Sequence, residues 1–356
     1  MKKIIIFISI ILIIVAGILY STYGRELLSK LDEKRVYSMS DAKTTSLNLL
    51  DEFKFYNGGI VTYNNQKLQF INYDSSVAWE RENNYFANRV FVTDNYIFSQ
   101  TDSKVEVLDK NNQKYVIAEI SGDILNVSRE NNEVFIIVRL GTGQNSLYVM
   151  NDNNEVVVDN KVFDDIITGV AISDKSEAYA LTTLNFEKGV PGNTLYFNLL
   201  DDVELWSVPI ENEILIRTQI VNNNVIAIGS KNIYYFNTNG KLMWKNSIYN
   251  KVADIEIDKE NQKIYILYDK DVKTELITYS FEGKVAEIQE APAGMDNLKL
   301  YGSKTFVAGT NGIFLLHGRK TDKIYEDSEG LITDFELDGN LIRIISKDKL
   351  VTGQIK

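Results

Sequence analysis

A short pattern of alternating apolar residues recurs along most of this chain, and it restricts the possible folds more than any other feature. Each copy has two residues that flank one other residue, both apolar except at Thr218, followed by a turn rich in Asn, Asp or Gly. A period of two is typical of β-strands. The eight pairs are Phe53/Phe55, Val90/Val92, Leu125/Val127, Val170/Ile172, Thr218/Ile220, Ile255/Ile257, Leu298/Leu300 and Phe335/Leu337.

The spacing of these pairs predicts a closed ring of repeated sheets. Their second members lie 35 to 48 residues apart, which is the repeat length of four-stranded propeller blades. Two more alternating strands and a shorter fourth strand follow the first in each unit, and tight turns such as Asn239-Gly240, Glu282-Gly283 and Asp338-Gly339 separate strands. We therefore predict an all-β fold, an eight-bladed β-propeller of four-stranded antiparallel blades. The fourth strands carry Trp79, Tyr115, Val157, Trp206, Trp244, Val285 and Tyr325.

The eighth unit has only three strands of its own, so its fourth strand must come from elsewhere. These three strands are expected at about Ile332–Leu337, Leu341–Ile345 and Leu350–Gln354. Unpaired sheet edges are costly, and an open ring would leave the third strand without a partner. Counting back from the first unit predicts that Val36–Thr45 supplies the outer strand of unit eight and joins the two ends of the ring.

A long apolar segment near the N-terminus predicts a membrane anchor. The run extends from Ile4 to Tyr20, follows Lys2 and Lys3 directly and is interrupted only by Ser9. With the next three residues it reaches about 20 residues, enough to cross a ~30 Å hydrocarbon core. It is longer than the roughly 7–15 apolar residues of a cleaved signal peptide, and no small-x-small cleavage site follows it. We predict an uncleaved transmembrane signal anchor over residues 1–23.

The residues around this segment predict its orientation and the division of the chain. A tail of three residues with two lysines is readily retained inside, so the body is expected outside the cytoplasm. Residues 24–35 are charged and have leucines at helical spacing, which predicts a short stalk. Residues 36–356 form the predicted propeller. The expected localisation is therefore the cell membrane, with a single pass and an extracytoplasmic propeller.

The charge of the body disfavours nucleic acid as a partner. The chain has a net charge of −11, and residues 1–35 carry six basic and three acidic side chains, which leaves the remainder at −14. An acidic body repels phosphate backbones. The sequence also contains no cysteine, so disulfides, thiolate metal sites, thiol nucleophiles and a lipid-modified N-terminal cysteine are excluded.

One segment of the fifth unit resembles a known repeat. The stretch FNTNGKLMWKNSI, from Phe236 to Ile248, has an apolar strand, an Asn-led turn with Gly-Lys, and then Leu-x-Trp. It is similar to the repeat of the PQQ-like propellers. The segments INYDSSVAWERE of unit one and FNLLDDVELWSVP of unit four are degenerate copies. The resemblance covers about residues 46–356.

This resemblance implies a structural role for the tryptophans and leaves the activity open. In PQQ-like propellers such tryptophans dock neighbouring blades, which implies the same role for Trp79, Trp206 and Trp244. That family contains quinoprotein dehydrogenases and also cofactor-free scaffolds, such as the lipoprotein that assists barrel assembly in the outer membrane. Its enzymes have an adjacent-cysteine disulfide over the cofactor, and this chain has no cysteine. The resemblance therefore favours a degenerate, non-enzymatic member with an N-terminal anchor.

The residues that could support catalysis or metal binding are few. His317 is the only histidine and lies near the end of a predicted third strand, so we interpret it as a blade-edge residue near a turn. Paired carboxylates can serve glycoside hydrolysis or bind a hard cation, but here they lie in predicted loops. These pairs are Asp164/Asp165, Asp201/Asp202 and Asp269/Asp271. We predict no catalytic, cofactor-binding or metal-binding residue, and no enzymatic activity.

Three loops depart from the simple repeat. Gly141–Ser146 is glycine-rich but lacks the Gly-Lys-Ser/Thr of a phosphate-binding loop, so we interpret it as a flexible connection. Asn151–Glu155 lacks the glycine and bidentate glutamate of a calcium loop and is interpreted as a hairpin turn. Asn185–Thr194 is an irregular insertion that lengthens unit four. Loops on one rim are where propellers place binding determinants, so this insertion is either a binding element or merely a long loop.

The combined pattern predicts a protein that binds partners. The first hypothesis is a membrane-anchored interaction scaffold of the cell envelope, with envelope proteins or cell-wall components as partners. The second is a sensor that binds a carbohydrate or a peptide in the centre of the ring. The third is a quinoprotein-type or other hydrolytic enzyme, which the missing cysteines and the single histidine oppose.

Overall fold

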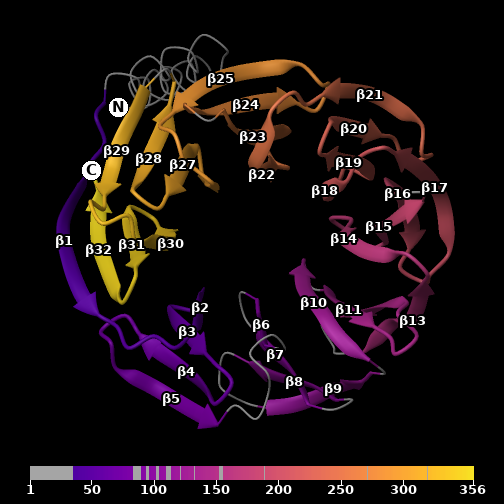
Figure 1. Cartoon of the computed structure of the whole chain (residues 1–356), viewed down its shortest axis with the longest axis horizontal. Helices are drawn as coiled ribbons and strands as arrows, with labels where there is room; N and C mark the ends of the chain where they lie inside the picture. The colour runs from indigo at the N-terminus through magenta and orange to yellow at the C-terminus, as the bar shows by residue number, and fades with distance from the viewer. Residues whose placement is uncertain are drawn as a thin grey trace, which may run out of the picture.

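The structure is a computed structural model of a ring of eight four-stranded antiparallel sheets around one axis (Figure 1). This confirms the predicted all-β, eight-bladed propeller. The structure describes residues 35–82, 90–93, 96–101, 104–109, 114–120, 122–131, 133–151, 155–187, 189–270, 272–318 and 320–356. The predicted anchor, residues 1–23, and all of the predicted stalk except Arg35 lie outside the described residues. Among those described, no helix is long and apolar enough to cross a membrane.

Each blade uses four strands that follow one another from the axis outward, except the last. Blades one to four are formed by β2 (Glu52–Tyr56), β3 (Gly59–Tyr63), β4 (Lys67–Asn72) and β5 (Val77–Glu82); β6 (Val90–Val92), β7 (Tyr96–Thr101), β8 (Lys104–Asp109) and β9 (Lys114–Glu119); β10 (Asp123–Glu130), β11 (Glu133–Arg139), β12 (Asn145–Met150) and β13 (Val156–Phe163); and β14 (Ile166–Ile172), β15 (Ala178–Glu187), β16 (Val190–Leu199) and β17 (Glu204–Glu211).

The second half of the ring repeats this arrangement. Blades five to eight are formed by β18 (Leu215–Val221), β19 (Asn224–Gly229), β20 (Asn232–Phe236) and β21 (Leu242–Ser247); β22 (Lys251–Asp258), β23 (Lys263–Asp269), β24 (Thr274–Ser280) and β25 (Val285–Ala291); β26 (Asn297–Tyr301), β27 (Lys304–Gly309), β28 (Gly312–His317) and β29 (Lys320–Glu326); and β30 (Ile332–Asp338), β31 (Leu341–Ser346), β32 (Lys349–Ile355) and β1 (Met39–Ser46). All eight predicted pairs lie on the innermost strands, and all seven predicted fourth-strand residues lie on the fourth strands.

The ring closes as the sequence predicts, with the first described strand completing the last blade. Strand β1 pairs antiparallel with β32, from Met39 opposite Ile355 to Ser46 opposite Lys349. Next to this ladder, Ser38 and Lys356 exchange backbone hydrogen bonds of 3.3 and 3.1 Å. The two ends of the ring are therefore joined within one sheet, and β32 has no unpaired edge.

The hydrophobic core lies between neighbouring blades. Alternate residues of a strand point to opposite faces of the sheet, so each blade presents an apolar surface to both of its neighbours. Between blades seven and eight, for example, Phe306 and Ile313 pack with Phe335 and Ile344, all fully buried. Burial of such a side chain contributes about 1.5–3 kcal/mol. The ring is thus stabilised by eight similar seams rather than by a single central core.

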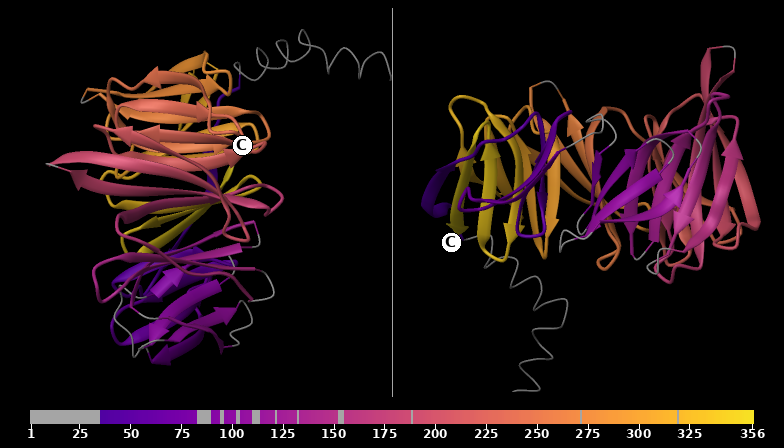
Figure 2. Two further views of the ribbon diagram at one scale, coloured as in Figure 1. Left: turned by 90° about the vertical axis from the view of Figure 1, so that its right-hand side faces the viewer. Right: turned by 90° about the horizontal axis from the view of Figure 1, so that it is seen from below.

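The two rims of the ring differ in what they carry. One rim carries the turns between first and second strands and between third and fourth strands, and we call it the terminal rim. Ser38 and Lys356 lie on this rim, beside the β30–β31 turn. We call the distal rim the one with the turns between second and third strands and the links between blades. The hairpin of β15 and β16 projects from the distal rim, on the face opposite the C-terminus (Figure 2). The ends of the described chain and the projecting hairpin therefore lie on opposite rims of the ring.

Two tryptophans each dock their own blade onto the next blade of the ring, as the resemblance of the repeat implies. The indole N–H of Trp206 donates to the Thr238 carbonyl of blade five at 2.9 Å. The indole of Trp244 donates likewise to the Phe281 carbonyl of blade six at 2.8 Å. Each indole also packs on the turn glycine of the next blade, because a Cβ placed on Gly283 would lie 2.8 Å from Trp244 Cδ2. Trp79 stacks on Phe70 within its own blade with ring centroids 6.0 Å apart, and the turn that would face it, residues 110–113, lies outside the described residues.

Candidate functional site

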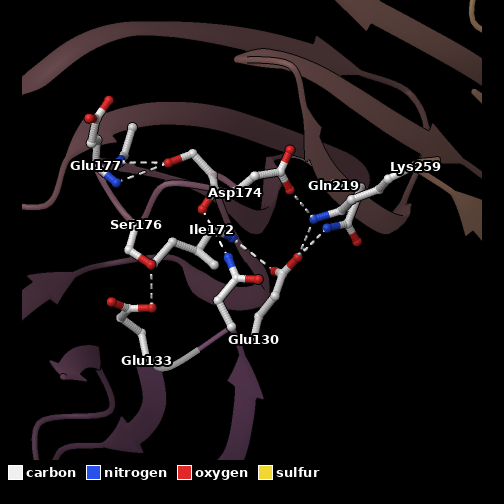
Figure 3. Close-up of polar contacts among 11 residues, drawn as sticks. Glu130, Glu133, Ile172, Asp174, Ser176, Glu177, Gln219 and Lys259 are labelled. Atoms are coloured by element: carbon white, nitrogen blue, oxygen red, sulfur yellow. Dashed lines mark hydrogen bonds and ion pairs between the residues drawn. The ribbon is translucent and has the colours of Figure 1, made fainter. Parts of the chain in front are cut away.

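A network of polar side chains connects the inner ends of four blades at the terminal rim. Lys259 follows β22 in blade six, and its Nζ lies 2.9 Å from Glu130 Oε1 of blade three and 3.0 Å from Asp174 Oδ1 of blade four (Figure 3). The side-chain amide of Gln219, on β18 of blade five, donates to the same oxygen of Glu130. The other carboxylate oxygen of Glu130 accepts the backbone N–H of Ile172 at 2.9 Å. One carboxylate thus binds groups from three other blades.

Electrostatics keep this network charged. Burial of Lys259 opposes its charged form, but the hydrogen bonds and negative charges of Glu130 and Asp174 outweigh this effect and raise the pKa of Lys259. The Lys259 and Glu130 side chains are only 28% and 25% exposed, so solvent screens this pair less than a surface ion pair. Because both oxygens of Glu130 are occupied, the network is suited to holding blades three to six in place rather than to catalysis.

A second contact strengthens the joint between blades three and four. Ser176 Oγ donates to Glu133 Oε2 at 2.6 Å (Figure 3). The side-chain amide of Asn131 donates to the Ser173 carbonyl at 3.0 Å. Glu133 begins β11, and the other three residues lie in the turns between the first and second strands of the two blades. The terminal mouth of the ring is therefore crosslinked on the side of blades three to six.

An open cleft lies on the opposite side of the ring axis, near the distal rim. It has a volume of about 490 Å³ and is lined by the inner strands of blades one, seven and eight. The lining residues are Asp51, Glu52, Phe53, Lys54, Phe55, Asn297, Lys299, Thr333, Asp334 and Glu336. Cavities of this size accept ligands of small-molecule or short-peptide size.

Half of the charged groups in the cleft are already paired. Lys299 forms a 2.7 Å ion pair with Asp334. Glu336 accepts a hydrogen bond from the Tyr73 hydroxyl and forms a 2.9 Å ion pair with Arg343. Burial, together with this hydrogen bond, raises the pKa of Tyr73 far above its ordinary value, so the phenol remains protonated.

The remaining charges of the cleft face solvent. Asp51, Glu52 and Lys54 are exposed, and within the described part of the chain none of them takes part in an ion pair. Two carboxylates and one ammonium leave the solvent-facing part of the cleft with a negative charge. The half-buried rings of Phe53 and Phe55 supply apolar contact beside these charges. Eight of the ten lining residues are polar or charged, so the cleft is suited to a polar ligand that also contacts the rings of Phe53 and Phe55.

A half-buried carboxyl group also lies on an inner strand. Glu256 is on β22, and burial raises its pKa above the ordinary value of 4.5, with Asp254 adding to the rise and Arg217 opposing it. This shift is the kind found at binding and catalytic sites as well as in structural positions. The sequence patterns did not single out Glu256, because its burial depends on how neighbouring blades pack.

The only histidine holds the start of the first strand in place. His317 ends β28 and is buried, with Nε2 2.7 Å from Asp322 Oδ2. The same oxygen accepts the backbone N–H of Tyr37 at 2.7 Å, and the Tyr37 ring packs edge-on against the imidazole with centroids 5.1 Å apart. Nδ1 of His317 has no hydrogen-bond partner among the described residues. His317 therefore lies at a blade edge, as predicted, within a buried joint between β28, β29 and the segment before β1.

The acidic pair Asp164/Asp165 joins two blades at the distal rim. Asp164 accepts a 2.7 Å hydrogen bond from the Gln144 amide in the β11–β12 turn of blade three. Asp165 accepts one of 3.1 Å from Asn185 on β15 of blade four. Gln144 belongs to the glycine-rich segment, which forms a closed turn in which Leu140 N–H donates to the Gln144 carbonyl at 2.8 Å. Local hydrogen bonds thus account for both the Asp164/Asp165 pair and the glycine-rich segment.

One carboxylate of each other acidic pair forms an ion pair. Asp201 and Asp202 lie in the turn before β17, as predicted, whereas Asp269 is the last residue of β23 and not part of a loop. Asp202 lies 2.6 Å from Lys161 Nζ, and Asp269 lies 3.3 Å from Lys251 Nζ. Asp271 lies outside the described residues. In the described ranges, no three or more His, Asp or Glu side chains are placed to hold a metal ion.

The insertion in unit four differs from its predicted irregular form. Strands β15 and β16 pair continuously from Ala178 opposite Leu199 to Glu187 opposite Val190, so the segment is a long regular hairpin. Gly189, with a φ of +80°, supplies the left-handed conformation of its tight turn. The tip extends past the neighbouring strand β17, whose pairing ends where Gly192 meets Glu211. The hairpin therefore projects because its strands are longer than those of the other blades.

Several exposed apolar side chains lie along the distal rim of blades three to six. They lie at the hairpin tip, in the links between blades and in the turn of blade six. These residues are Val162, Ile166, Phe186, Val190, Ile214, Tyr249 and Val272. We call them the distal apolar set. Tyr249 and Val272 are 88% and 89% exposed, so almost their entire side chains face solvent. Exposed apolar side chains also lie toward the terminal rim, among them Val36, Leu205 and Met243. The distal apolar set differs from these in lying on the same rim as the projecting hairpin.

Comparison with known proteins identifies a family that has no assigned function. The family of unknown function DUF5711 matches residues 29–350. The chain belongs to this family. No curated protein sequence matches the chain. The DUF5711 match covers all eight blades up to the start of the last strand, so it spans the ring as a whole.

Solved structures share the fold of this DUF5711 protein at low sequence identity. BamB from Moraxella catarrhalis aligns with a TM-score of 0.55 and 12% identity, over 89% of this chain and 99% of that chain. Sqt1 from Chaetomium thermophilum aligns with a TM-score of 0.60 and 10% identity, over 89% and 100%. The Pan2 WD40 domain of Neurospora crassa aligns with a TM-score of 0.50 and 8% identity, over 75% and 88%. These similarities establish the propeller fold.

Proposed function

We propose that this DUF5711 protein is a membrane-anchored, extracytoplasmic propeller that acts as a protein-interaction scaffold in the cell envelope. Its partners are envelope proteins or cell-wall components, and nucleic acid is not among them. It performs no catalysis and needs no cofactor. In this proposal it is a degenerate, non-enzymatic member of the PQQ-like propellers, an interpretation that the docking of Trp206 and Trp244 on the following blades supports.

The main support for this proposal is that the described chain begins on one rim and the hairpin projects from the other. The described chain begins at the terminal rim, where Ser38 pairs with Lys356. An anchor formed by residues 1–23 would therefore turn the terminal rim toward the bilayer. The distal rim, with the projecting hairpin and the distal apolar set, would then face away from the membrane. Phe186 and Tyr249 are aromatic and exposed there, and aromatic residues are enriched in protein interfaces.

The side chains suited to chemistry support a binding role. His317 and Asp322 are buried together and both contact Tyr37, which occupies them in a structural joint. Glu130 has both carboxylate oxygens engaged. The cleft near the distal rim favours a second candidate function, the sensor that binds a carbohydrate or a peptide, because it combines two phenylalanine rings with solvent-facing charges.

Topology is tested with intact protoplasts. We expect added protease to degrade the propeller, and N-terminal sequencing of the membrane form to begin at or near Met1. A mature protein that begins near Thr22, or a propeller protected until the membrane is lysed, would contradict the anchored, extracytoplasmic arrangement.

The scaffold role is tested by shortening the hairpin tip. Residues 186–191 are replaced by Asn-Gly, which retains a two-residue turn between Asn185 and Gly192. Proteins that co-purify with the full chain from solubilised membranes are quantified for both forms. We expect specific partners to be depleted in the shortened form. A matched control replaces Asn65-Gln66 in the corresponding turn of blade one with Asn-Gly. Equal recovery in all three forms would contradict a partner surface at the hairpin.

A further inference from the structure

The cleft exposes the free edge of an inner strand. Five consecutive residues, Asp51 to Phe55, line it, and four of them belong to β2. Strand β2 is the last strand of its sheet, so only β3 pairs with it. The other edge faces the axis of the ring, where β26 and β30 complete the cleft. A cleft lined by a strand edge offers backbone groups as well as side chains.

The register of β2 shows which peptide groups face the cleft. Tyr56 pairs with Gly59 across a two-residue turn, in which Asn57 and Gly58 have φ values of +42° and +80°. Such a turn makes the flanking residues a hydrogen-bonded pair, and hydrogen-bonded pairs then alternate along the ladder. The N–H and C=O groups of Phe53 and Phe55 therefore point away from β3, toward the cleft. They are spaced as one side of a vacant ladder.

The charges of the cleft select the kind of segment that fits. Lys299 and Glu336 are paired within the ring, which leaves Asp51, Glu52 and Lys54 facing solvent. This excess of carboxylates, in a body with a charge of −14, attracts basic side chains. The apolar rings of Phe53 and Phe55 lie beside the same edge.

We propose that the cleft binds an extended peptide segment that carries lysine. The segment's main chain pairs with the free edge of β2 at Phe53 and Phe55, and a lysine ammonium group lies beside Asp51 and Glu52. Strand addition of this kind draws affinity from main-chain hydrogen bonds and specificity from alternate side chains. The inference goes beyond the proposed scaffold role, because it requires neither the anchor nor the projecting hairpin.

The test uses the full chain in detergent micelles and a defined probe. The probe is an acetylated, amidated, fluorescently labelled hexapeptide of alternating valine and lysine, and its binding is measured by fluorescence anisotropy. Two derivatives carry N-methyl groups, one on the three valines and one on the three lysines. Only one edge of an added strand faces β2, so we expect one derivative to lose about tenfold or more in affinity while the other stays within about threefold.

The charge contribution is tested with matched variants. We expect the double substitution Asp51→Asn with Glu52→Gln to weaken binding of the lysine probe about tenfold. The control Glu204→Gln removes an exposed carboxylate from β17, outside the cleft, and is expected to bind as the unmodified protein does. A valine–glutamate hexapeptide should bind at least tenfold more weakly than the lysine probe.

Several results would overturn the inference. They are equal binding of both N-methylated derivatives, no binding of the lysine probe at millimolar concentration, or an unchanged affinity in the double variant. Binding of chitotetraose without binding of the peptide would assign the cleft to a carbohydrate instead. None of these results bears on the membrane topology or on the hairpin partners, so failure here is distinguishable from failure of the proposed function.

Discussion

Lys259 of blade six forms a 2.9 Å ion pair with Glu130 of blade three, although blades four and five separate them along the ring. The pair therefore bridges the inner ends of four blades and does not merely join neighbours. Since Asp174 and Gln219 of the intervening blades bind the same two residues, the bridge acts as one network. It constrains the relative positions of half of the ring.

Removal of the Lys259 ammonium group should loosen this side of the ring. We expect Lys259→Gln to lower the free energy of unfolding by about 1–2 kcal/mol, because it leaves Glu130 and Asp174 without their cation in a partly buried site. The control is Lys251→Gln, which removes an exposed pair with Asp269 and should cost less than about 0.5 kcal/mol. Urea denaturation measures both variants, and equal effects would show that the bridge adds no stability.

Ring closure depends on the ladder between β1 and β32. Leu47 N–H donates to the Asp348 carbonyl at 2.7 Å, so in this register the N–H of Thr45 also points to β32 and that of Thr44 points outward. We expect Thr45→Pro to destabilise the protein by about 2 kcal/mol more than Thr44→Pro, since only the first removes a ladder hydrogen bond. Thermal unfolding compares the two, and equal melting temperatures would argue against closure through this ladder.

Blade docking by Trp244 should contribute less than a fully buried aromatic would. The indole is only partly buried, so we expect Trp244→Ala to cost about 2–3 kcal/mol, below the range for fully enclosed tryptophans. Gly283→Ala should also destabilise, because its φ is +78° and the added Cβ would meet the indole. Met243→Ala, at a 55% exposed neighbour, is the control and should be nearly neutral. A neutral Trp244→Ala would contradict the docking role.

The raised pKa of Glu256 predicts a specific pH dependence. The folded state favours the protonated carboxyl, so its stabilising contribution is complete below the unfolded pKa, near 4.5, and is lost as pH rises through the higher folded value. Glu256→Gln should therefore raise stability at pH 7 and change it little at pH 4. Melting temperatures from pH 4 to pH 8 test this. An equal effect of the exposed control Glu204→Gln would contradict it.

The fold could be predicted from the sequence because each blade repeats the same local pattern. The pairs at Phe53/Phe55 and Phe335/Leu337 mark inner strands through their alternation alone, and the missing strand of unit eight required a partner such as β1. The projecting hairpin was harder to predict. Its segment contains Pro191 and two glycines, which are typical of loops, yet continuous pairing with β15 makes it a strand.

The candidate sites could not be predicted, because they depend on the geometry of the ring. Lys259 and Glu130 are 129 positions apart, and no local pattern relates them. The cleft brings β2 near β26 and β30 only once the ring has closed. The joint of His317 with Tyr37 likewise requires the first described residues to lie against blade seven. In each case the sequence pattern predicts the strand on which a residue lies. Which residues of other blades it contacts depends on the number and order of the blades.

Site-specific photo-crosslinking in living cells tests the central claim most directly. A photoreactive benzoyl-phenylalanine is placed at Phe186, which is 58% exposed at the hairpin tip, or at Met243, which is 55% exposed toward the terminal rim on blade five. Because the two positions are similarly exposed, a difference between them reports on the rim. If the distal rim binds partners, Phe186 yields discrete adducts with envelope proteins or wall fragments and Met243 yields few. Adducts from Met243 alone, equal yields from both positions, or none from either would contradict partner binding at the distal rim.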